Sequence, residues 1–196
     1  MFDWRVIFGF TAGVIAFLAC GLYILSILRG KTAPSKATWW IWSLVQIMLS
    51  ITFWQSARDS NAIWVSVGYT AGAIATAFLT IKYGESGWDK TDKYCLLLSF
   101  VAIGVWISTN ATFALLGILL ADILGAIPTV KKSYLEPWKE DLPAWGLGFS
   151  SNVINIFVLG SLWRLDSLYP IYLLLMTGMV VIVLFIRRKF VAPPKG

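Results

Sequence analysis

The sequence contains no histidine, so it lacks the side chain that most often serves as a general base, proton shuttle or metal ligand near neutral pH. It has only two cysteines, Cys20 and Cys95, which we expect to lie at different depths, so neither a disulfide framework nor a thiolate metal site is expected. GxSxG, P-loop and other Gly-rich phosphate-binding motifs are also absent from the sequence. We therefore predict that the protein is not an enzyme and uses neither a metal nor a cofactor.

Charge is scarce as well, at 13% of the residues, whereas hydrophobic residues make up 58% and the mean hydropathy is +0.75. This balance lies far from that of soluble domains. A bilayer crossing needs roughly 20 apolar residues, and the sequence predicts seven such segments in an all-α integral membrane protein of the plasma membrane or the bacterial inner membrane. The segments are Val6 to Leu28, Thr38 to Ser56, Ala62 to Lys82, Tyr94 to Ile107, Ala111 to Val130, Ala144 to Trp163 and Leu168 to Ile186.

The basic residues predict the orientation of these segments. With seven crossings, Arg5, Arg58 and Arg164 lie on the N-terminal side, and the other thirteen of the sixteen Lys and Arg residues lie on the opposite side. Because cationic loops stay in the cytoplasm, we expect the N-terminus outside and the C-terminus in the cytoplasm. Joining the short fourth segment to the fifth would place the later basic loops on the wrong side. We also expect the first segment to remain in the membrane rather than to be a cleaved signal.

The net charge of +6 is explained by these inner loops, which face anionic lipid headgroups, so no nucleic-acid partner is expected. A repeat is present as well, because residues 38–84 and 144–190 align at an offset of 106 without a gap. Matched positions are Trp39 with Trp145, Gln46 with Asn152, Arg58 with Arg164, Gly72 with Gly178, and Lys82 with Arg188. Two repeats of the same orientation require one reversing helix between them.

We therefore predict a three-plus-one-plus-three organisation with two parallel three-helix repeats. The first repeat covers residues 1–83, a linker with the fourth helix covers 84–110, the second repeat covers 111–190, and a cytoplasmic tail covers 191–196.

The second repeat carries the stretch "IPTVKKSYLEPWKEDLPAW", in which a proline near the inner helix end is followed by a basic loop. With the helix plan, this stretch resembles the PQ-loop and SWEET superfamily of small transporters, although Thr129 stands where that family has glutamine. The first repeat, "GLYILSILRGKTAPSKATWW", has no proline within the helix. The chain therefore resembles a divergent member, and the PnuC family of vitamin-precursor transporters is a close alternative. The resemblance implies transport by alternating access and a gate at the proline.

Polar and aromatic residues inside the predicted helices are the candidate solute contacts. Polar side chains at membrane depth usually face the bundle interior, and an aromatic ring beside a carboxamide suits a neutral polar solute such as a sugar or nucleoside. The repeat pairing predicts that Gln46 and Asn152 face each other across a central cavity. The predicted substrate-binding residues are Gln46, Asn152, Trp42, Asn155, Tyr69 and Phe149. Helix packing is the competing interpretation of each position.

Asp122 is the one acidic residue within the long apolar segments. It is interpreted either as a proton-coupling, cation or solute site, or as a structural acid that holds helices together. Six residues later, Pro128 removes a backbone donor, and with Thr129 it is the predicted gate or hinge.

These features predict a facilitator or proton-linked carrier of a small polar solute. The alternative is a non-transporting membrane receptor, accessory or scaffold protein with the same fold. The expected partners are the lipid bilayer, a small polar solute and, as an open alternative, further copies of the chain.

Overall fold

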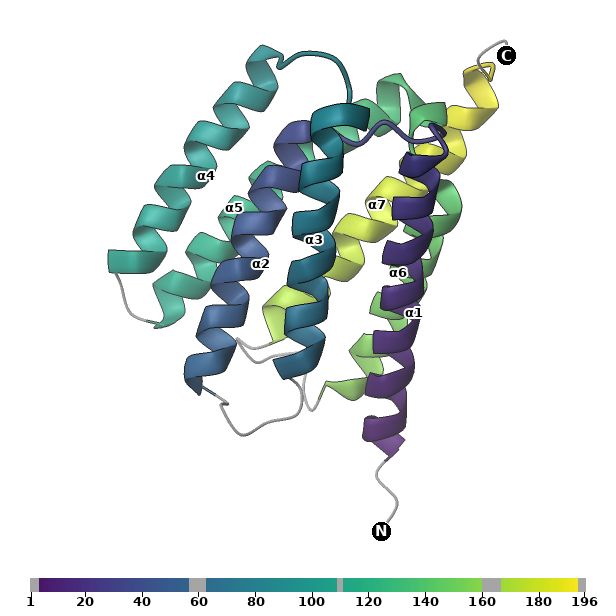
Figure 1. Cartoon of the computed structure of the whole chain (residues 1–196). Helices are drawn as coiled ribbons and strands as arrows, with labels where there is room; N and C mark the ends of the chain where they lie inside the picture. Colours follow the sequence, from purple (N-terminus) through teal and green to yellow (C-terminus); the bar gives the residue numbers. More distant parts are fainter. Residues whose placement is uncertain (1–3, 57–62, 109–110, 160–166, 194–196) are drawn as a thin grey trace. The chain divides into compact units, whose positions relative to one another are not determined.

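The computed structural model describes residues 4–56, 63–108, 111–159 and 167–193, and all regular structure within these ranges is helical (Figure 1). The predicted all-α fold is confirmed for this part of the chain. The helices are α1 (Trp4–Leu28), α2 (Lys36–Ser56), α3 (Ile63–Tyr83), α4 (Lys90–Ser108), α5 (Ala111–Leu135), η1 (Pro137–Lys139), α6 (Leu142–Val158) and α7 (Leu168–Phe190). Seven α-helices thus occupy the described ranges, one for each predicted segment.

Several helix ends differ from the predicted ends. The fourth helix begins at Lys90 rather than Tyr94, and the fifth continues to Leu135 rather than ending at Val130. Lys131 and Lys132, which were predicted to lie in a loop, are therefore helical. The sixth helix ends at Val158, five residues before the predicted end.

The helices pack as two compact units. The first unit comprises Met1–Thr32 and Ser133–Gly196, and the second comprises Ala33–Lys132. The first unit therefore combines α1 with α6 and α7, whereas α2, α3, α4 and most of α5 form the second. This grouping is based on packing, so it differs from the contiguous sequence repeats, whose boundaries stay a prediction.

In the first unit, α1 packs against α6, and α6 packs against α7. The buried face of α1 begins with small residues, Ala12, Ala16 and Ala19, and continues with Tyr23, Ser26 and Ile27. The Ser151 hydroxyl of α6 donates to the backbone oxygen of Ala12 at 2.7 Å, which requires the two helices to approach closely.

The end of α1 follows from Gly30. This glycine has a φ of 68°, while the Lys31 N–H bonds to the Ser26 oxygen and the Gly30 N–H bonds to the Ile27 oxygen. Such paired bonds around a left-handed glycine form a Schellman motif, which stops the helix.

The core of the second unit lies between α2, α4 and α5. Its buried residues are Ile41, Val45, Met48, Cys95, Ala102, Ile118 and Ala121. These residues are four and three positions apart on α2, seven apart on α4 and three apart on α5, so each helix turns one stripe inward.

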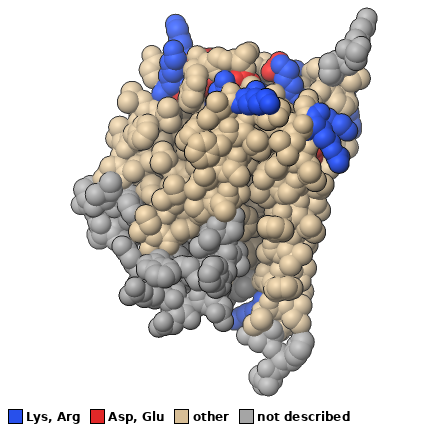
Figure 2. Space-filling view, in the orientation of Figure 1, with Lys and Arg blue, Asp and Glu red and all other residues tan. Residues whose placement is uncertain are grey.

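The outward helix faces are apolar over much of their length. Exposed large side chains include Phe10, Phe17, Phe78, Ile81, Leu97, Val101, Leu120, Leu175 and Ile182. On the face drawn in Figure 2, most Lys, Arg, Asp and Glu side chains lie along the upper edge, and the residues drawn in tan below them are uncharged. Among the described residues, α1 and α7 are long and apolar enough to cross a membrane.

Candidate functional site

Asp122 lies on α5 where this helix contacts α2. This residue is 3% exposed, and its backbone oxygen accepts a hydrogen bond from the Trp42 indole N–H at 3.2 Å. Trp42 packs edge-on against Trp39, with 5.4 Å between the ring centroids. Gly125, one turn after Asp122, provides the space for this contact, since a Cβ there would lie 3.0 Å from Trp42 and 2.8 Å from Ile41. The sequence-predicted Trp42 and Asp122 thus lie together in the second unit.

A second polar contact joins the same helices nearer the basic end of α5. The Thr129 hydroxyl donates to the Thr38 hydroxyl at 2.9 Å, and both residues are fully buried. Pro128, immediately before Thr129, lies inside α5 and cannot bond to the carbonyl one turn earlier. The helix nonetheless continues beyond it, so contacts to α2 and α4 hold the segment that follows the proline.

Gln46 lies on α2 next to a hydroxyl contact with α3. The Thr70 hydroxyl donates to the backbone oxygen of Gln46 at 3.1 Å, and it lies 2.7 Å from the Ser50 hydroxyl. Gln46 itself is half-buried, whereas Tyr69 is 40% exposed. Gln46 and Tyr69 therefore lie in different environments. The contact between α2 and α3 at this point is made by Thr70, the residue after Tyr69.

The remaining predicted residues belong to the first unit. Asn152 on α6 donates from Nδ2 to the Thr177 hydroxyl of α7 at 3.3 Å. Phe149 packs against Gly178, where a Cβ would lie 3.0 Å from the ring, and Asn155 is half-buried. Gln46 and Asn152 therefore lie in separate units, and their opposition across a cavity stays a prediction.

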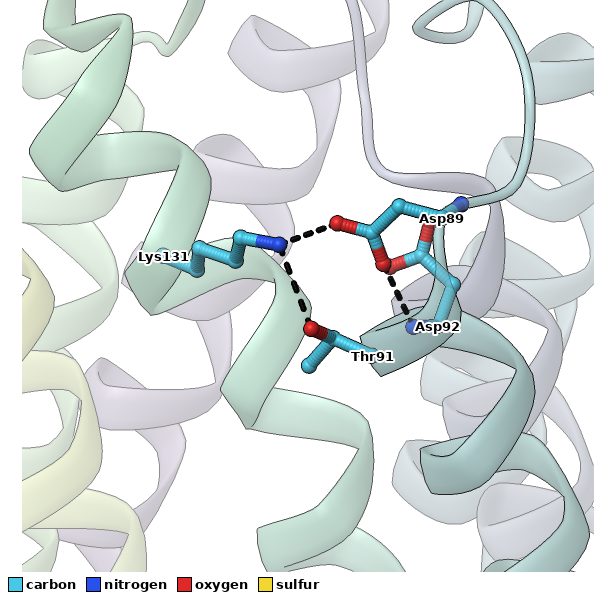
Figure 3. Close-up of polar contacts among 4 residues, drawn as sticks. All are labelled: Asp89, Thr91, Asp92 and Lys131. Atoms are coloured by element: carbon cyan, nitrogen blue, oxygen red, sulfur yellow. Dashed lines mark hydrogen bonds and ion pairs between the residues drawn. The ribbon is translucent and has the colours of Figure 1, made fainter.

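At the end of the second unit, α5 is joined to the start of α4 (Figure 3). The Lys131 ammonium group pairs with Asp89 and donates to the Thr91 hydroxyl at 3.2 Å. Asp89 and Asp92 each accept the other's backbone N–H, at 2.8 and 3.0 Å, which is a reciprocal cap for α4. The hydrogen bond from Lys131 lowers the pKa of Asp89 and raises that of Lys131, while burial raises the pKa of Asp92.

A buried carboxylate that sequence reasoning missed lies in the first unit. Glu140 is 1% exposed, and its Oε2 atom accepts from the Tyr23 hydroxyl and the Trp145 indole N–H, both at 2.9 Å. Arg188 of α7 donates to its backbone oxygen at 2.5 Å. Glu140 thereby connects all three helices of this unit. Glu140 stands in a charged stretch of the sequence, and no local pattern there indicates that it is buried.

The described residues contain no group of three or more His, Cys, Asp or Glu side chains that could hold a metal ion. The Trp42 indole lies at Asp122, and the Thr38–Thr129 hydroxyl contact lies two turns further along α5. The indole N–H bonds to the Asp122 backbone and the two hydroxyls bond to each other, so a neutral polar molecule that used these groups would have to replace these contacts. Comparison with models of protein families, with curated proteins and with solved structures gives no match to this chain.

Proposed function

We propose that the protein is an integral membrane protein with seven transmembrane helices. The support is the distribution of side chains: large apolar residues such as Phe17 and Leu97 face outward, while three of the six buried residues of α1 are alanine. Water disfavours such an outer surface, whereas lipid accepts it and leaves helices to associate through small residues. The two helices that are long and apolar enough to cross a membrane, α1 and α7, agree with this proposal.

The positions of the basic residues support a cytoplasmic location for one end of each unit. In the second unit, Lys131 contacts Asp89 before α4, Lys132 donates to the backbone oxygen of Ala33 before α2, and the Glu85 N–H after α3 bonds to the Pro34 oxygen. In the first unit, Arg188 reaches Glu140 before α6. Under the positive-inside rule, these ends lie in the cytoplasm and the N-terminus lies outside.

Within this membrane protein, we propose transport of a small polar solute such as a sugar, a nucleoside or a vitamin precursor. The observation that carries the proposal is the burial of Asp122 on α5, where the Trp42 indole of α2 bonds to its backbone oxygen, with the Thr38–Thr129 contact between the same helices two turns further along. A carboxyl group at membrane depth is costly and is usually retained for a solute or ion pathway. The similarity in plan to the PQ-loop and SWEET superfamily, with PnuC as the alternative, supports the same proposal.

Uptake by proteoliposomes tests this function. The purified chain is reconstituted and exposed separately to labelled sugars, nucleosides and vitamin precursors, with protein-free liposomes as the control. We expect saturable uptake of at least one class, and excess unlabelled solute should suppress it. If reconstituted, folded protein gives no uptake of any class, the non-transporting receptor or accessory function takes its place.

A further inference from the structure

The C-terminal end of α7 carries a surface in which basic and aromatic side chains are combined. Arg187 lies over the Tyr134 ring at 4.0 Å from its centroid, and its Nε donates to the Tyr134 backbone oxygen at 2.8 Å. Lys189 lies over Phe185 at 4.4 Å. Between these cations on the helix lies the exposed apolar face of Ile186 and Phe190, of which Phe190 is 77% exposed. We call Tyr134, Phe185, Ile186, Arg187, Lys189 and Phe190 the α7 end surface.

The cations of this surface have no acidic partner within the described ranges. Glu136 is 2.6 Å from Lys139, Glu140 is buried against Tyr23 and Trp145, and Asp141 caps α6 through the Ala144 N–H. Each nearby carboxylate is therefore engaged elsewhere. Arg187 and Lys189 leave a net positive charge beside exposed apolar side chains.

Arg188, unlike Arg187 and Lys189, is engaged by other residues of the first unit and does not belong to the α7 end surface. It donates to the backbone oxygens of Pro137 and Glu140 and stacks on Trp138 at 4.8 Å. Burial lowers the pKa of its guanidinium group. Arg188 therefore holds η1 and the residue before α6 against α7, and Arg187 and Lys189 remain for an external anion.

We propose that the α7 end surface binds the headgroup of an anionic phospholipid. A soluble anion would account for the two cations but not for the exposed Ile186 and Phe190 between them. An amphiphile accounts for both, because its phosphate pairs with Arg187 and Lys189 while its acyl chains cover the apolar face. The ring of Tyr134 fixes the Arg187 guanidinium, whose terminal nitrogens have no partner among the described residues. This inference depends on the proposed membrane location but not on transport.

Native mass spectrometry of the full chain, extracted from mixed bilayers of phosphatidylcholine and phosphatidylglycerol, tests the proposal. We expect the wild type to retain phosphatidylglycerol preferentially. Each basic residue near a membrane surface contributes about 1 kcal/mol, so Arg187→Gln and Lys189→Gln should each weaken retention about fivefold, and the double variant about 25-fold.

Lys90→Gln combined with Lys93→Gln is the matched control, because these two lysines lie beside Asp89 and Asp92, where local charge nearly cancels. Its retention should equal that of the wild type. Arg187→Lys keeps the positive charge, so it shows whether the loss in Arg187→Gln comes from the missing charge or from a folding defect. Lys189→Gln removes only the contact of Lys189 with the Phe185 ring, so it should leave the fold intact. Equal retention in wild type and double variant would overturn the proposal, as would an equal loss in the control.

Inorganic phosphate in excess distinguishes a lipid from a soluble anion. We expect it to leave phosphatidylglycerol bound, since phosphate gains nothing from Ile186 and Phe190. Displacement by phosphate would reject the lipid assignment. A chain that is soluble without detergent and retains no lipid would reject the membrane location itself, whereas failed uptake with retained lipid would reject only transport.

Discussion

Gly125 provides the space in which Trp42 and Ile41 contact α5. Gly125→Ala would place a Cβ at 2.8 Å from Ile41, which is fully buried, so neighbouring atoms must move. Overpacking of this kind costs about 1–3 kcal/mol, and we expect a lower thermal midpoint in detergent. Gly104→Ala is the control, since its Cβ would meet nothing within 4 Å and alanine favours helix. A midpoint for Gly125→Ala equal to or above that of Gly104→Ala would contradict this packing.

If the proposed transport takes place, a substitution at Asp122 tests whether it is coupled to protons. Asp122→Asn keeps the size of the side chain and its capacity for hydrogen bonds but removes the titratable carboxyl group. If transport is linked to protons, we expect the variant to lose the pH dependence of net uptake and still to exchange solute across the bilayer. If uptake by Asp122→Asn depends on pH in the same way as uptake by the wild type, the role of Asp122 is structural. The backbone contact from Trp42 should persist in either case, because it uses the carbonyl oxygen.

The end of α5 shows which features of an element the sequence can predict. Hydropathy locates the apolar stretch and therefore ends the fifth helix at Val130, but backbone hydrogen bonds continue to Leu135. The side chains of Lys131 and Lys132 reach Asp89 and the backbone of Ala33, so these lysines serve as helical residues with long-range contacts. Such partners are distant in sequence, and no local pattern indicates them.

The start of α4 could have been predicted more closely. Asp89 and Asp92 stand three residues apart, the spacing of a reciprocal cap, and both donate and accept as such a cap requires. Hydropathy alone placed the start four residues late, at Tyr94. Glu140 was beyond sequence reasoning for a different reason: its burial depends on Tyr23, 117 residues away.

The contact between α5 and α4 should depend on Lys131. In Lys131→Met, Asp89 loses the hydrogen bond that lowers its pKa, and we expect faster amide exchange in the first turn of α4. Lys93→Met is the control on α4, because the Lys93 side chain is exposed. Amide exchange that is equal in both variants at neutral pH would contradict the role of the pair.

The pH dependence of this contact has a definite sign. The pKa of Asp89 lies below its ordinary 3.8, so stability from its charge is present above that value and is lost as acid protonates it. The raised pKa of Lys131 gives stability below its ordinary 10.5, lost as the pH rises through the raised value. Burial raises the pKa of Asp92, so protonation of Asp92 in acid stabilises the fold and partly offsets the loss from Asp89. The negative charge of Glu85 favours the charged form of Lys131. We expect a plateau in α4 protection between these limits, and steep loss near neutrality would contradict it.

Orientation in the membrane is a property of the whole molecule. Since thirteen of the sixteen basic residues fall on one side of the predicted crossings, we expect the segment from Lys131 to Pro143 to face the cytoplasm. A single cysteine replacing the exposed Lys139, in a chain without Cys20 and Cys95, should resist an impermeant thiol reagent applied to intact cells and react after permeabilisation. Labelling in intact cells would contradict the proposed orientation.

The most direct measurement of transport is solute counterflow with matched variants in proteoliposomes. Vesicles loaded with unlabelled solute should accumulate labelled solute transiently when wild-type protein is present. Gln46→Ala and Asn152→Ala each remove a predicted hydrogen bond to solute, so we expect about fivefold weaker apparent affinity, whereas Ser150→Ala, on the exposed side of α6, should match the wild type. If no solute class gives counterflow above that of protein-free vesicles, the proposal of transport is contradicted.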